Sequence, residues 1–277
     1  MISGVDLSAF QQGPGVWEKE AGKIDFAAVK LTELSSAGPY VSPTAAADWA
    51  ALKALGKGRV AYMFGHPGMG VSASVSLFLR TLDACGLEDG DGVALDLEVT
   101  DGLRAAAVAA WGADVLALLE RETSRPPLLY TFISFAEAGN CAGLGKYPLW
   151  LADPSSPPGK PRVPAPWKTW AIQQTGISGS IDRDVANFHD LAAMRKALGK
   201  QVPVAKVADY CTDGKLSLAA IATAHGCDAG RILRLTVVRD GRFAAGLADY
   251  VNGVFAGTVP PSAPLPAGLV LRVPVKP

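Results

Sequence analysis

The sequence predicts an α/β protein whose first part, roughly two hundred residues, closes into a barrel. Short apolar runs typical of buried strands alternate there with helical patterns, which favours a parallel sheet. The strands number about eight, which favours a closed barrel over an open sheet. Acidic side chains stand at the carboxyl ends of several predicted strands, where barrels of this kind carry their chemistry: Asp6, Glu33, Asp96 and Glu98.

The predicted elements follow in order along the chain. Strands are expected over residues 3–7, 26–31, 59–64, 93–99, 127–132, 149–152 and 170–174, and helices over 42–55, 71–84, 103–122, 135–140 and 187–198. Ser42 before Pro43 is a favourable helix start, and Asp101 is expected to cap the helix that follows it. Helices become sparse after Asn140, so the last third of the barrel is expected to be helix-poor.

The strand expected over residues 93–99 carries the strongest chemical signal. Alternation along a strand points Asp96 and Glu98 to the same face. Two neighbouring carboxylates cannot both ionise cheaply when buried, so one pKa rises, as a general acid requires at neutral pH. The alternative is a pair of surface acids, each paired with a Lys or Arg. The other acids at strand ends favour the catalytic interpretation.

Composition excludes several classes of partner. Lys+Arg and Asp+Glu are 26 each in 277 residues, so no basic field indicates nucleic acid or an anionic membrane. No apolar run is long enough to span a bilayer, and the first residues do not resemble a signal peptide. The four cysteines form no CxxC pair, which argues against zinc, although Cys211 and Cys227 could pair in an oxidising environment. No metal or organic cofactor is expected.

Seven short motifs in a fixed order resemble glycoside hydrolase family 25, the Chalaropsis-type N-acetylmuramidases of bacteria and phage endolysins. They are Gly-Val-Asp-Leu-Ser at 4–8, Val-Lys-Leu-Thr-Glu at 29–33, Val-Ala-Tyr-Met-Phe at 60–64, Leu-Asp-Leu-Glu at 95–98, Leu-Leu-Tyr-Thr at 128–131, Leu-Trp-Leu-Ala at 149–152 and Ile-Asp-Arg-Asp at 181–184. The resemblance covers about residues 1–190. It implies a flattened, TIM-like (β/α)5β3 barrel with an acidic groove for glycan strands.

The resemblance also assigns roles to residues. Glu98 matches the general acid of the family. The acids grouped around it match Asp6, Asp96 and Asp182, although Asp184 is an alternative to Asp182. Tyr62 matches a tyrosine near the reacting sugar, and Lys30 with Glu33 matches an ion pair on the second strand. Further groove-lining residues are expected at Phe64, Tyr130, Trp150 and Trp170. Ile172-Gln173-Gln174-Thr175 replaces the Trp-Gln-Tyr-Thr of the family, so one aromatic wall of the groove is missing or supplied from elsewhere.

The implied function is hydrolysis of the β-1,4 bond between N-acetylmuramic acid and N-acetylglucosamine in bacterial peptidoglycan. A monomer is expected, made in a host cytoplasm and acting on the wall after release. One alternative is a chitinase-like enzyme, because residues 91–98 nearly fit Asp-Gly-x-Asp-x-Asp-x-Glu; however, Ala94 replaces the middle aspartate. The other alternative is a catalytically inactive protein that binds peptidoglycan without hydrolysing it.

Residues 200–277 change character after a barrel domain of residues 1–199. Their strand–helix–helix–strand pattern resembles a LysM module, which binds glycans that contain N-acetylglucosamine. Two departures are an insertion over about residues 238–264 and Thr236, where the family usually has Asn. The alternative is a small α/β appendage that packs on the barrel.

Overall fold

The computed structural model describes residues 1–9, 17–178, 181–199, 207–224, 232, 263–267 and 269–274. The chain divides into two compact units, Met1–Val202 and Pro203–Pro277. Each unit is described by itself.

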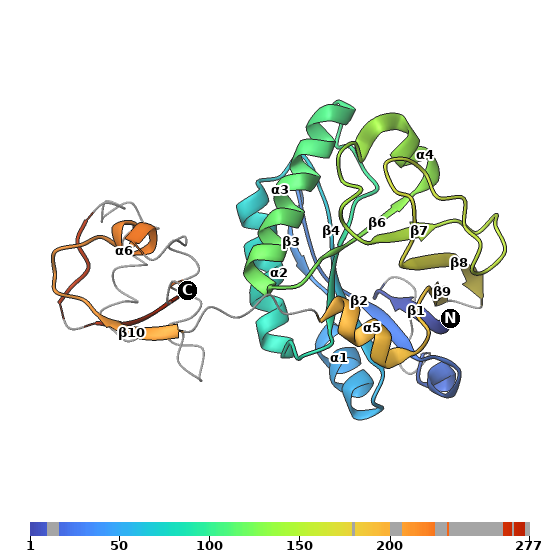
Figure 1. Ribbon diagram of the computed structural model, residues 1–277, viewed down its shortest axis with the longest axis horizontal. Helices are drawn as coiled ribbons and strands as arrows, with labels where there is room; N and C mark the ends of the chain where they lie inside the picture. The colour runs from blue at the N-terminus through green and yellow to red at the C-terminus, as the bar shows by residue number, and fades with distance from the viewer. Residues whose placement is uncertain are drawn as a thin grey trace. The chain divides into compact units, whose positions relative to one another are not determined.

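Within the described part of the first unit, eight strands close into a mixed barrel (Figure 1). They are β1 (Ile2–Leu7), β2 (Phe26–Ser35), β4 (Gly58–Phe64), β5 (Gly92–Asp96), β6 (Leu128–Phe132), β7 (Leu149–Ala152), β8 (Ile172–Ser178) and β9 (Ile181–Ala186). From β1 to β8 neighbouring strands are parallel, whereas β9 runs antiparallel to both β8 and β1 and closes the ring. An additional strand, β3 (Gly38–Val41), forms a hairpin with the end of β2.

Helices cover the barrel unevenly. Three helices lie along one side of it, α1 (Ala45–Ala54), α2 (Val71–Cys85) and α3 (Ala105–Thr123) (Figure 1). Shorter pieces are η1 (Glu18–Lys23), α4 (Ile133–Phe135), η2 (Ala136–Asn140) and α5 (Leu191–Leu198). Residues 153–171 between β7 and β8 are all described and contain no helix, in agreement with the helix-poor last third that the sequence predicts.

The core has two layers, because strand residues alternate between the barrel interior and the surrounding helices. Large side chains such as Trp49 and Phe78 fill the outer layer. The interior is packed at the amino ends of the strands by residues such as Phe26, Val60 and Leu128. Gly4 makes room for this packing, since a Cβ there would lie 2.3 Å from the Phe26 ring. The apolar packing leaves only the carboxyl end of the interior for polar side chains.

Two predicted helix starts are wrong by a few residues. Helix α1 begins at Ala45 with Thr44 before it, so Ser42 is not its cap. Helix α3 begins at Ala105, and Asp101 does not cap it. Asp101 instead adopts a left-handed backbone conformation (φ 47°), and its carboxylate is engaged by His66 and by the Gly68 amide.

Three strand predictions also need correction. Strand β5 ends at Asp96, so Glu98 lies just beyond it, although the Leu97 amide still donates to the Tyr130 carbonyl. Strand β8 begins at Ile172, which leaves Trp170 outside it. Asp182 and Asp184 lie on β9, a strand that is not among those predicted from the sequence and that pairs on both sides. Pairing with two neighbours, which no local pattern reveals, forms this last strand.

The second unit contains an antiparallel pair, β10 (Val207–Cys211) with β11 (Val270–Pro274), and helix α6 (Leu218–Ala224). Cys211 is an exposed, free thiol, and Cys227 lies outside the described residues. Thr236, nearly all of the predicted second helix and nearly all of the 238–264 insertion also lie outside them. Across the described ranges, no helix has the length and apolarity needed to cross a membrane.

Candidate active site

Side chains at the carboxyl ends of the parallel strands, and at the amino end of the antiparallel strand β9, surround a pocket of about 210 Å³. On the parallel strands these inward-facing residues follow the apolar packing, as β2 illustrates with Phe26, Ala28 and then Lys30. The lining residues are Asp6, Ser8, Lys30, Tyr62, Phe64, Asp96, Glu98, Tyr130, Trp150, Gln174 and Asp182. Strand alternation therefore delivers the whole set to one end of the barrel.

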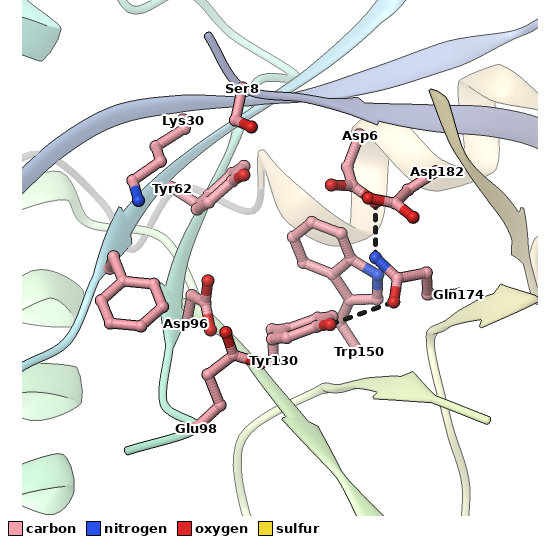
Figure 2. Close-up of a pocket in the computed structure, with 11 residues that line it drawn as sticks. Asp6, Ser8, Lys30, Tyr62, Asp96, Glu98, Tyr130, Trp150, Gln174 and Asp182 are labelled. Atoms are coloured by element: carbon pink, nitrogen blue, oxygen red, sulfur yellow. Dashed lines mark hydrogen bonds between the residues drawn. The ribbon is translucent and has the colours of Figure 1, made fainter. Parts of the chain in front are cut away.

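The carboxyl groups form two facing pairs (Figure 2). Asp96 and Glu98 come from the end of β5, and Asp6 and Asp182 come from β1 and β9. Asp6 and Asp182 are direct cross-strand partners in the antiparallel register. Like charges in that position repel one another, so the pair is disposed to hold a proton.

Burial and the repulsion of neighbouring carboxylates raise the pKa values of Asp6, Asp96 and Glu98. Burial raises the pKa of Asp6 to about 7, and Asp182 adds to the rise. Burial and then Glu98 hold the pKa of Asp96 well above its usual range. Burial also raises the pKa of half-buried Glu98, while Lys30 acts in the opposite direction. A protonated carboxyl group near neutral pH is what general acid catalysis needs.

Gln174 links the two sides of the pocket. Its amide donates to Asp6 Oδ2 at 2.8 Å, and its carbonyl accepts from the Tyr130 hydroxyl at 3.0 Å (Figure 2). Gln174 stands where the Trp-Gln-Tyr-Thr motif of the family has its tyrosine, and it orients the Asp6 carboxylate of the site. The sequence signal was the position of Gln174 two residues after the buried Ile172, which puts the two side chains on the same face of the strand.

Asp184 lies beneath the pocket and does not line it. Its Oδ1 accepts from Trp150 Nε1 at 2.9 Å, and its side chain hydrogen-bonds with Asp6. Two carboxyl groups can share a hydrogen bond only if one is protonated. Burial and then Asp6 hold the pKa of Asp184 well above its usual range, whereas this bond lowers the pKa of Asp6. Asp184 is therefore the member of this pair that is disposed to hold the proton.

A chain of ion pairs holds Lys30 in place. Lys30 Nζ lies 2.8 Å from Glu33 Oε2, and Glu33 Oε1 lies 3.0 Å from His66 Nε2. His66 Nδ1 lies 2.9 Å from Asp101 Oδ1, whose other oxygen accepts from the Gly68 amide. Although burial lowers it, the bonds to Asp101 and Glu33 raise the pKa of His66. This network fixes a cation beside Asp96 and Glu98.

Comparison with known proteins identifies the family. The profile of the glycosyl hydrolases family 25 matches residues 5–181. The chain belongs to glycosyl hydrolase family 25. The uncharacterized protein YegX of Escherichia coli (strain K12) is 27% identical over 201 residues, which cover 67% of this chain and 70% of YegX.

Solved structures agree with this family 25 assignment. A family GH25 lysozyme from Aspergillus fumigatus superposes with a TM-score of 0.58 at 26% identity, covering 71% of this chain and 98% of that one. A muramidase from Acremonium alcalophilum gives a TM-score of 0.62 at 23% identity, covering 73% and 100%. At 23% identity, the similarity to the Acremonium alcalophilum muramidase shows only that the fold is shared.

This family 25 structure gathers most of the residues that the sequence singles out. All of them line the pocket except Glu33, Trp170 and Asp184, the alternative to Asp182. Glu33 lies behind Lys30 in the ion-pair chain. Trp170 was expected to line the groove, but it lies before β8, at the opposite end of the strand from the pocket, and lines a different hollow. Trp150 is 1% exposed and packs edge-on against Tyr62 and Tyr130, so it forms the pocket floor.

Sequence reasoning missed several functional candidates. Ser8 and Gln174 line the pocket, and His66 with Asp101 anchors its lysine. No sequence signal pairs His66 with Asp101, because 35 residues separate them and only the fold brings them together. Among the described residues, no group of three or more His, Cys, Asp or Glu side chains could hold a metal ion.

Replacing Lys30 with methionine is expected to move the alkaline limb of the activity profile to higher pH. The reason is that Lys30 lowers the pKa of Glu98, so removing its charge keeps Glu98 protonated to higher pH. The measurement is kcat/KM on a soluble glycan from pH 4 to 9, with exposed Lys23→Met as the control. An unmoved or lowered limb would contradict the assigned role.

Proposed function

We propose that the chain hydrolyses the β-1,4 bond between N-acetylmuramic acid and N-acetylglucosamine in bacterial peptidoglycan, with Glu98 as the general acid. The observation that carries the proposal is the position of Glu98. It is a half-buried carboxyl group of raised pKa in a pocket that also holds Asp6, Asp96 and Asp182. Membership of family 25 and the likeness to a family GH25 lysozyme support the same substrate class.

In the proposed reaction, Glu98 donates its proton to the bridging oxygen as the bond from that oxygen to the sugar C1 breaks. The carbonyl oxygen of the 2-acetamido group of the same sugar attacks C1, assisted by Asp96 or Asp182. Water then opens the resulting ring at C1, and the Glu98 carboxylate takes the proton from that water. Asp6 is held by Gln174 and Asp184, and its pKa of about 7 lets it take up or release a proton next to Asp182 during the reaction.

Digestion of purified peptidoglycan, followed by mass spectrometry of the soluble fragments, tests the proposal. We expect fragments with N-acetylmuramic acid at the reducing end. Fragments that end in N-acetylglucosamine would mean that the other glycosidic bond is cut. Cleavage of chitin oligomers in preference to peptidoglycan would favour the chitinase-like alternative. Wall binding without any released fragment would favour a binding protein that no longer turns over.

For the remainder of the chain we propose a cell-wall-binding role. The described pair of strands and helix of the second unit are compatible with a LysM-like module, and a linked glycan-binding module would raise the effective concentration of the barrel at the wall. We also propose the finer (β/α)5β3 description for the barrel, synthesis in a host cytoplasm with action after release, and a monomeric state. Analytical ultracentrifugation checks the last of these.

A further inference from the structure

A second hollow, of about 440 Å³, lies at the opposite end of the barrel strands from the acidic pocket. Its walls are residues 145–149, which lead into β7, and residues 166–171, which lead into β8. Because β7 and β8 are parallel neighbours, both segments enter at the amino ends of their strands. The acidic pocket instead lies at the carboxyl ends. The volume of the second hollow falls in the range of ordinary ligand sites.

The walls of this hollow are fixed by hydrogen bonds and close packing. Trp167 Nε1 donates to the Tyr147 carbonyl at 2.9 Å, which ties the two segments together. The segments also touch at Gly145, where a Cβ would lie 2.7 Å from the Pro166 carbonyl oxygen. The Asn187 side chain donates to the Trp170 carbonyl at 3.3 Å. The hollow is therefore held open by the fold itself.

Its lining has the opposite charge to the acidic pocket. Tyr147 and Trp167 are buried, Trp170 is half-buried, and Lys146 and Lys168 are exposed. No Asp or Glu is among the lining residues, although Glu120 acts on Lys146 from a longer distance. An aromatic surface flanked by ammonium groups suits a ligand with an apolar face and a negative charge.

We propose that this hollow binds an anionic strand of wall glycan, with a sugar ring packed on Trp170 and its carboxylates paired with Lys146 and Lys168. This inference rests on the proposed function, because the peptide-bearing sugars of peptidoglycan supply both the ring faces and the carboxylates. The two sites lie at opposite ends of the barrel, so the occupant is a neighbouring strand of the mesh and not the strand being cut. Holding it raises the local concentration of cleavable strands.

Binding to insoluble peptidoglycan tests the second site, using the full chain with Glu98→Gln so that the wall stays intact. Trp170→Ala and the double variant Lys146→Ala/Lys168→Ala are each expected to weaken binding about tenfold. Trp170→Phe, which keeps an aromatic ring, is expected to stay within about twofold. Lys196→Ala, which removes an exposed cation on α5, is the matched control. The exposed lysines make the double variant informative even if Trp170→Ala folds poorly.

Active chains with the same substitutions supply a second readout. Release of fragments from insoluble wall is expected to fall severalfold, whereas turnover of a short soluble oligosaccharide stays unchanged. Unchanged wall binding in the double lysine variant would overturn the second site. An equal loss of binding to neutral chitin and to peptidoglycan in that variant would overturn it too, because the lysines would then not recognise the negative charge of the glycan. If the unmodified chain releases no fragments at all, the proposed function fails instead, which separates the two outcomes.

Discussion

Glu98→Gln is expected to lower kcat on peptidoglycan roughly a thousandfold while wall binding is retained. Glutamine has the shape of the protonated acid but cannot deliver its proton to the leaving oxygen. Glu98 is half-buried and lines the pocket together with Asp96, Tyr130 and Asp182, so the substitution leaves the packing in place. The measurement is the rate of reducing-end release from purified wall at the pH optimum.

A change of leaving group sharpens this experiment. An aryl glycoside whose phenol leaves readily needs little protonation, so the loss caused by Glu98→Gln is expected to be much smaller on that substrate. Glu18→Gln, at an exposed position on η1, is the matched control and is expected to behave as the unmodified chain. An equal loss on both substrates would show that Glu98 does not act as the acid.

Asp184→Asn is expected to stabilise the barrel at pH 8 by about 1–3 kcal/mol and to change its stability little at pH 4. The pKa of Asp184 is higher in the folded chain than in the unfolded chain, because burial and Asp6 oppose ionisation. Above about pH 4 the folded chain therefore holds more protons than the unfolded chain, so the free energy of unfolding falls as the pH rises. Asparagine mimics the protonated acid, so it removes this penalty.

A second substitution separates charge from packing at the same position. Asp184→Ala also removes the charge, but it leaves Trp150 Nε1 buried without its acceptor, which costs about 1–3 kcal/mol. It is therefore expected to be less stable than Asp184→Asn at every pH. Tryptophan fluorescence during thermal unfolding is the measurement, since all 6 tryptophans precede residue 203 and report on the first unit.

Exposed Asp114→Asn on α3 is the control for this series, and its unfolding midpoint is expected to follow that of the unmodified chain across the pH range. A midpoint for Asp184→Asn that runs parallel to the unmodified chain from pH 4 to 8 would show that Asp184 is not the protonated partner of Asp6.

The sequence by itself determined the fold class, the family and most of the pocket. Short apolar runs located seven of the barrel strands, and their carboxyl ends pointed to Asp6, Asp96 and Glu98. These signals are local: burial on both faces makes a strand apolar, and the first polar residue after it is the one that reaches the barrel opening. Ordered motifs supplied Tyr62, Lys30 and Asp182.

Only the tertiary structure decided which polar side chains meet. Strand β9 forms because β8 and β1 both pair with it, and that pairing puts Asp182 in the pocket and Asp184 below it. The ring closure brings Gln174 to Asp6, 168 residues away in the chain. Trp170 precedes the first residue of β8, so the direction of that strand places it at the opposite end of the barrel from the groove that it was expected to line. Such contacts depend on register and closure, which are properties of the whole sheet and leave no trace in a local pattern.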